Sequence, residues 1–138
     1  MALETVSDPR LEPGDMLLRL SAAAICGTDI RIYRGRKTRG VRLPSILGHE
    51  FTGAIVDTGG HAGWKTGDHA AVCPALPCGT CRECRAGFEN ICANLTAFGY
   101  ERDGGFAELI RVPKAFIVPG NLFRLDRGVS LLAAALAE

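Results

Sequence analysis

The sequence predicts a mainly β protein, built as an antiparallel barrel or sandwich with few short helices. Two observations support this fold class. Short apolar runs recur along the chain, and the clearest of them alternates apolar with polar residues. The 17 glycines and 7 prolines are scattered between these runs, where they mark turns. Short strands at this spacing favour an antiparallel all-β architecture over parallel α/β units.

We expect five strands. The first follows the Pro13-Gly14 turn, where Met16, Leu18 and Leu20 alternate with Leu17, Arg19 and Ser21, a period of two that is typical of a half-buried strand. The expected strand ranges are 16–22, 51–58, 69–73, 106–112 and 115–118.

Two helices are expected. Thr28 and Asp29 are good capping residues for a short helix running to Tyr33. Ser130 can cap a second helix over residues 131–137. Because that segment is apolar on every side, we expect the second helix to be buried.

Length and composition limit the possible classes of protein. The 138 residues fit one domain with a real core. A net charge of +1 gives no broad field for nucleic acid or an anionic membrane, and no apolar run approaches the ~20 residues of a membrane-spanning helix. The first fifteen residues lack the pattern of a signal peptide. We therefore expect a cytoplasmic protein without nucleic-acid or membrane partners.

The most specific motif is a group of four cysteines spaced C-x2-C-x2-C-x7-C. Its members are Cys78, Cys81, Cys84 and Cys92. Four thiolates at such short spacing are typical of a closed, structural zinc site. An iron–sulfur cluster would close with C-x3-C-P, and a disulfide pair would need an oxidising compartment. These two alternatives and unligated cysteines stay open, but zinc is the favoured interpretation.

Two shorter motifs lie outside this group: Cys26-Gly27-Thr28-Asp29 and Gly48-His49-Glu50. Each is weak when taken alone. A single cysteine is more often a small core residue, and a single histidine more often a hydrogen-bonded loop residue than a ligand.

Taken together with the four cysteines, the motifs resemble those of the zinc-containing medium-chain dehydrogenases, the alcohol and polyol dehydrogenase family. The matching segments are ICGTD (25–29), LPSILGHEFTG (43–53), GWKTGD (63–68), the cysteine group, GGFAE (104–108) and AALAE (134–138). The resemblance runs along nearly the whole chain. It implies a GroES-like fold, a distorted β-barrel with a catalytic zinc and a structural-zinc lobe at about 75–97.

The resemblance also implies roles for residues of the shorter motifs. Cys26 and His49 would be ligands of the catalytic zinc, while the third protein ligand stays open between Glu50 and Glu138. A catalytic zinc needs about three protein ligands and one open position. Asp29 would orient His49 from behind, and Thr28 would pass the substrate proton outward.

The implied function is NAD(P)-dependent oxidation of a small alcohol or polyol. The sequence carries no G-x-G-x-x-G fingerprint, so the nucleotide-binding domain of the family is absent from these residues. By the same resemblance, we expect the first strand of the family to be missing as well. We therefore expect one catalytic domain over residues 1–138 that binds zinc but has no turnover alone. The parent enzyme is expected to be a homo-oligomer.

A run of cations separates the two zinc-site motifs. No acidic residue occurs between Asp29 and Glu50, and the cations there are Arg31, Arg34, Arg36, Lys37, Arg39 and Arg42. Arg31 stands where many relatives have a histidine of the proton relay, and arginine does not readily accept a proton. The run is either a solvated loop or an anion site beside the zinc that suits a phosphorylated substrate.

Two other classes of function fit the sequence less well. A GroES-like assembly module with only the structural zinc would leave the motifs at Cys26 and His49 without a purpose. A zinc-ribbon nucleic-acid binder would be more basic and richer in aromatic residues than the 7% found here. The metal content of the chain separates the enzyme domain from the assembly module.

Overall fold

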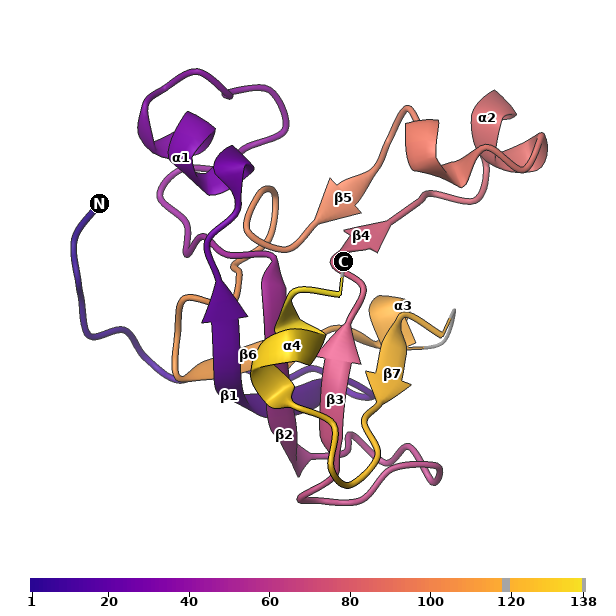
Figure 1. Cartoon of the computed structure of the whole chain (residues 1–138). Coiled ribbons are helices and arrows are strands. Elements are labelled where there is room, and N and C mark those ends of the chain that lie inside the picture. Colours follow the sequence, from indigo (N-terminus) through magenta and orange to yellow (C-terminus); the bar gives the residue numbers. More distant parts are fainter. Residues whose placement is uncertain (118–119, 138) are drawn as a thin grey trace.

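A five-stranded antiparallel sheet forms the body of the protein in the computed structural model, which describes residues 1–117 and 120–137 (Figure 1). Its strand order is β6-β1-β2-β3-β7, and β4 pairs with β5 in a separate two-stranded ribbon. The strands are β1 (Met16–Ala24), β2 (Glu50–Asp57), β3 (His69–Val72), β4 (Ala75–Leu76), β5 (Thr96–Ala97), β6 (Leu109–Val112) and β7 (Leu122–Arg124). The helical segments are α1 (Gly27–Tyr33), α2 (Arg82–Arg85), the 3-10 turn η1 (Glu89–Ile91), α3 (Lys114–Ile117) and α4 (Leu131–Ala135). The mainly β prediction is confirmed.

Strand β1 lies inside the sheet, between β6 and β2, and the alternation in its sequence correctly predicted a strand. Met16 and Leu18 are fully buried, whereas Arg19, the residue after Leu18, faces solvent. β1 pairs with β2 from Leu17–Asp57 to Ala24–Glu50, and with β6 from Met16–Val112 to Arg19–Leu109. The end of β1 therefore lies beside the beginning of β2.

The core lies against one face of this sheet and is closed by aromatic rings. Phe51 from β2 meets Phe98 edge to face, with ring centroids 5.5 Å apart, and Phe98 lies 4.5 Å from the ring of Phe116. Such aromatic pairs add about 0.5–1.5 kcal/mol to the burial of their area. The other members of the cluster are Met16, Leu18, Ile55, Ala70, Val72, Ile110, Val112, Ile117 and Leu122.

The prediction of a strand over 115–118 is wrong within the described residues. Residues 114–117 form the helical turn α3, and Val118 lies outside the described residues. The backbone N–H of Phe116 donates to the carbonyl of Pro113 at 2.8 Å, which closes the turn. A short apolar run does not distinguish a strand from a buried helical turn by its periodicity. The last strand of the sheet is β7, which the sequence reading missed.

The strand expected at 106–112 begins only at Leu109. Residues 104–106 bond instead to the loop that leads into β2, whereas the carbonyl of Glu108 accepts from the sheet, from the N–H of Leu20 at 2.9 Å. The N–H groups of Gly104, Gly105 and Phe106 donate to the carbonyls of residues 46, 48 and 47, over 2.8, 2.8 and 2.9 Å. This segment therefore supports the residues around His49.

Helix α4 begins where Ser130 predicts, and the Ser130 hydroxyl accepts a hydrogen bond from the N–H of Ala133 at 3.3 Å. The prediction that the helix is buried is wrong. Leu132 is 72% exposed and Leu136 65% exposed, while Ala135 is buried. The reason is that α4 packs only one side against β1 and β2, in front of which Figure 1 shows it.

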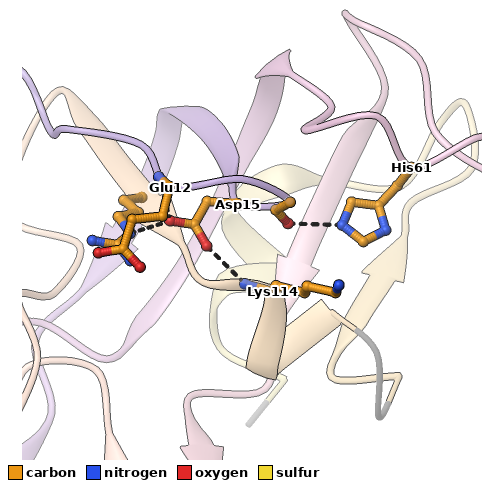
Figure 2. A network of polar contacts seen from close by, with 6 residues as sticks. Glu12, Asp15, His61 and Lys114 are labelled. Atoms are coloured by element: carbon orange, nitrogen blue, oxygen red, sulfur yellow. Dashed lines mark hydrogen bonds and ion pairs between the residues drawn. The ribbon is translucent and has the colours of Figure 1, made fainter.

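A network of polar contacts ties the beginning of β1 to the segment after β6 (Figure 2). The buried Asp15 carboxylate accepts hydrogen bonds from the N–H groups of Glu12 at 2.9 Å and Lys114 at 3.0 Å. It also pairs with the guanidinium of Arg111, which reaches Glu12 at 3.1 Å. Next to it, the His61 ring bonds to the carbonyl of residue 14 at 2.8 Å. Contacts between segments almost a hundred residues apart hold this end of the sheet together.

Candidate metal centres

Three metal-binding side chains meet where β1 ends and β2 begins. Ala24 pairs with Glu50, and Cys26 follows two residues after Ala24 at the start of α1. His49 precedes Glu50 in the chain. The ligand atoms of Cys26, His49 and Glu50 all lie within 4.8 Å of one another. The antiparallel pairing thus brings a sulfur to an imidazole and a carboxylate that lie more than twenty residues further along the chain.

Asp29 supports this group from the interior. One carboxylate oxygen accepts the N–H of Cys26 at 2.9 Å, which ties the helix start to the ligand-bearing residue. The other oxygen accepts the N–H of Gly48 at 3.3 Å and lies 3.6 Å from Nδ1 of His49. Asp29 is 2% exposed and His49 is 4% exposed. One buried carboxylate therefore fixes both halves of the group.

Gly48 allows the backbone to turn into β2 at this point. Its φ of +93° lies in the left-handed region, which side chains disfavour. A Cβ there would lie 2.7 Å from the ring of Phe106, and a Cβ on Gly104 would lie 2.0 Å from the carbonyl oxygen of Gly48. The segment 104–106 is therefore packed directly onto the turn, and both glycines are needed for the close approach.

The donor set fits zinc at an open site. One thiolate, one imidazole and one carboxylate are all ordinary zinc ligands, and three protein ligands leave a fourth position free. The proposed relay residue Thr28 is half-buried in the first turn of α1 and lines a pocket beside the group. The other acid expected as a possible ligand, Glu138, lies outside the described residues.

The sequence did not indicate which aromatic ring would lie beside His49. The ring of Tyr100 lies 5.3 Å from the ring of His49, tilted by 57°. Tyr100 follows β5 in a loop, with no periodicity that would point to the site. The consecutive glycines at 104–105 gave a better signal, since close approach of two backbones commonly needs them.

The four cysteines of the C-x2-C-x2-C-x7-C motif lie together in a separate lobe. β4 and β5 form a short ribbon, and Figure 1 shows the loop with α2 at its far end, away from the main sheet. The ligand atoms of Cys78, Cys81, Cys84 and Cys92 lie within 4.8 Å of one another, and Sγ of Cys81 is 3.9 Å from Sγ of Cys92. None of these cysteines forms a disulfide.

These distances fit a four-sulfur metal site. Sulfurs placed about 2.3 Å from a central zinc in a tetrahedron are about 3.8 Å apart. Backbone N–H groups point at the sulfurs: that of Cys84 donates to Cys81 over 3.4 Å, and those of Cys78 and Asn94 donate to Cys92 over 3.3 and 3.4 Å. Such donors stabilise thiolates, the form that binds metal.

The thiol pKa values in the lobe diverge for a physical reason. Hydrogen bonds from the backbone and hydroxyl of Thr80 lower the pKa of Cys78 to about 5. Burial, together with the sulfurs of Cys81 and Cys92, raises the pKa of Cys84 to about 12. Four thiolates this close repel one another, so a central cation is needed for all four to ionise.

The fold and the two donor groups define a domain of the zinc-dehydrogenase type. The family model for the alcohol dehydrogenase GroES-like domain matches residues 12–121, and the chain belongs to this family. No helix in the described ranges, 1–117 and 120–137, combines the length and apolarity needed to cross a bilayer.

Several relatives are similar over most of this chain. An L-threonine 3-dehydrogenase of Pseudoalteromonas translucida is 39% identical over 121 residues, covering 83% of this chain and 35% of the relative. The solved galactitol-1-phosphate dehydrogenase of Escherichia coli is 32% identical with a TM-score of 0.79, covering 97% and 37%. A Sinorhizobium meliloti protein described as a zinc-binding dehydrogenase, solved with NADP, is 34% identical with a TM-score of 0.84, covering 95% and 36%. The chain spans about a third of the length of these relatives.

Proposed function

We propose that this chain is the zinc-binding catalytic domain of an NAD(P)-dependent dehydrogenase that oxidises a small alcohol or polyol. The observation that carries the proposal is the meeting of Cys26, His49 and Glu50, separate from the cysteine lobe. A module with only a structural metal has no need of a second donor group. The names of the relatives, which include threonine and galactitol-1-phosphate dehydrogenases, support a hydroxyl-bearing substrate.

In this proposal Cys26, His49 and Glu50 hold the catalytic zinc, with Glu138 as the alternative carboxylate. Bound zinc polarises a substrate hydroxyl and favours its loss of a proton. Asp29 keeps the His49 ring oriented and makes it a better ligand, because a carboxylate behind an imidazole raises its basicity. The four cysteines of the lobe hold a structural zinc.

Thr28 is placed to carry the substrate proton away from the site. Thr28 lines a pocket of about 410 Å³ that opens beside the donor group. Arg31 lines the same pocket and stays protonated, so it cannot accept that proton. Proton transfer beyond Thr28 therefore goes to solvent in the pocket.

A nicotinamide nucleotide would accept the hydride, and these 138 residues carry no glycine fingerprint that would hold it. We accordingly expect no turnover from this chain when it is supplied with NAD or NADP and small alcohols. Measurable nucleotide reduction by the purified chain would contradict this part of the proposal.

Metal analysis of the purified chain tests the central claim. We expect two zinc ions per chain, one for each donor group. Cys26→Ser should remove one of them, whereas Cys73→Ser, a half-buried cysteine outside both groups, should remove none. A single zinc that Cys26→Ser leaves in place would refute the catalytic site and favour the assembly module.

A further inference from the structure

A strongly basic pocket lies beside the first donor group. It has a volume of about 410 Å³, within the range of roughly 300–1,000 Å³ typical of small-molecule sites. Its lining residues are Thr28, Arg31, Arg36, Lys37, Thr38, Arg39 and Tyr100. Tyr100 also faces the ring of His49 at 5.3 Å, so the pocket and the donor group share one wall.

No carboxylate among residues 1–117 and 120–137 pairs with any of the four cationic side chains of the pocket. Arg42, the last cation of the run, is different: it pairs with Asp103 at 2.6 Å and does not line the pocket. The nearby carboxylate of Glu101 accepts the N–H of Ala97 at 3.0 Å. The four cations repel one another, and a bound anion would relieve that repulsion.

The loop that carries three of these cations is ordered by its backbone. The N–H groups of Arg36 and Lys37 both donate to the carbonyl of Arg31, at 2.8 and 3.2 Å. The Lys37 ammonium lies 4.7 Å from the centre of the Tyr100 ring and donates to the carbonyl of Arg39 at 3.3 Å. The backbone of this loop is therefore held against α1, and its lysine against the ring of Tyr100.

We propose that this pocket binds a phosphate group carried by the substrate, while the substrate hydroxyl lies at the Cys26–His49–Glu50 group. This inference rests on the proposed function, which identifies a hydroxyl as the reacting group of the substrate. Arginine recognises phosphate through paired hydrogen bonds, and the pocket supplies three arginines with a lysine. The hydroxyl of Thr38 adds a neutral donor. The pocket therefore selects phosphorylated alcohols over neutral ones.

Calorimetric titration of the purified zinc-loaded chain tests the pocket with inorganic phosphate, and with acetate as a monoanionic comparison. Phosphate should bind more tightly than acetate, and added salt should weaken its binding. Arg36→Ala should weaken phosphate binding about tenfold, as expected for the loss of one charged hydrogen-bonding partner. Arg42→Ala is the matched control, because this arginine belongs to the same run but lies outside the pocket, and it should bind phosphate as the parent chain does.

The outcomes separate this inference from the proposed function. Absent phosphate binding, equal binding of acetate, or equal losses in Arg36→Ala and Arg42→Ala would each overturn the phosphate pocket. None of these results depends on the zinc count, which tests the metal site alone. Circular dichroism and the thermal midpoint of Arg36→Ala should match those of the parent chain, since the side chain is exposed. Amide NMR shifts of Thr28 and Thr38 on phosphate addition provide a second readout, and unchanged shifts would also overturn the pocket.

Discussion

Asp29 and His49 approach each other inside the protein, with Oδ1 of the carboxylate 3.6 Å from Nδ1 of the imidazole. The same carboxylate holds the backbone at Cys26 and at Gly48. One side chain thus positions both segments that bring metal-binding groups to the site. Substitution of Asp29 therefore tests whether the positioning matters for metal affinity.

Asp29→Asn should lower the zinc affinity of the first donor group by about 10–100-fold, because the amide carries no charge to support the His49 ring. Competition titration with a zinc chelator measures this loss. Asp103→Asn is the matched control, since Asp103 is exposed and contacts Arg42 and the N–H of Ile46 instead. Equal affinities in Asp29→Asn and the parent chain would contradict the positioning role.

Cys81→Ser should unfold the lobe between Cys78 and Cys92 while leaving the main sheet folded. The reason is that structural zinc contributes on the order of 10–16 kcal/mol of apparent binding energy in small zinc-dependent peptides. Hydrogen exchange should show fast amides in the lobe and protected amides in β1 and β2. Cys73→Ser provides the comparison. If Cys81→Ser left exchange in the lobe unchanged, the lobe would not depend on a metal.

The Asp15 network predicts an acid-sensitive contribution to stability. Burial alone would raise the pKa of Asp15, but the N–H groups of Glu12 and Lys114 and the Arg111 guanidinium hold this pKa below its usual value. A lowered pKa in the folded state means that the contribution is fully present above the unfolded value of about 3.9. It is lost as the pH falls below that value and through the folded pKa.

Asp15→Asn should therefore lower the free energy of unfolding by about 1–3 kcal/mol at neutral pH. Its unfolding free energy should also fall less than that of the parent chain when the pH drops below about 4. Denaturant titrations at several pH values measure both effects. Asp8→Asn, in the exposed N-terminal segment, should change neither. Parallel pH profiles for Asp15→Asn and the parent chain would count against the network.

Thr52 links β2 to α4 through its fully buried hydroxyl, which donates to the carbonyl of Leu131 at 3.1 Å. Thr52→Val keeps the volume but leaves that carbonyl without this donor, at a cost of about 1–3 kcal/mol. Amides of α4 should then exchange faster with solvent. Thr52→Ser keeps the hydroxyl and should leave α4 protected, so equal exchange in the two variants would contradict the link.

A strand could be predicted from the sequence where its apolar–polar alternation follows from the pleat of that strand alone. The alternation in 16–22 is a property of the local pleat, and β1 covers that range. By contrast, the turn at α3 depends on packing of Phe116 against Phe98, which no local pattern encodes. The late start of β6 likewise depends on hydrogen bonds from residues 104–106 to a loop far away in the chain. Contacts between distant parts of the chain thus accompany both differences between the predicted and the observed elements.

The candidate site was predicted residue by residue through the resemblance, and the structure brings Cys26, His49 and Glu50 together. Their roles as ligands stay predictions. The place of Tyr100 beside His49 was not predictable, because a loop residue takes its position from tertiary contacts. The sequence left open whether the basic run is a solvated loop or an anion site, since charge in a sequence does not say whether side chains converge. The structure places four of its cations around one pocket, and binding of an anion there stays a prediction.

The pairing of Ala24 with Glu50 limits how this domain can change. We expect that the loop 34–46 can gain or lose residues without moving the three donor atoms, because α1 holds one end of it and hydrogen bonds to residues 104–106 hold the other. A single residue inserted near the end of β1 would instead shift the alignment of the two strands and turn Cys26 to the opposite face. Substrate preference can therefore change through the loops. The number of residues between the Ala24–Glu50 pair and Cys26 must stay constant.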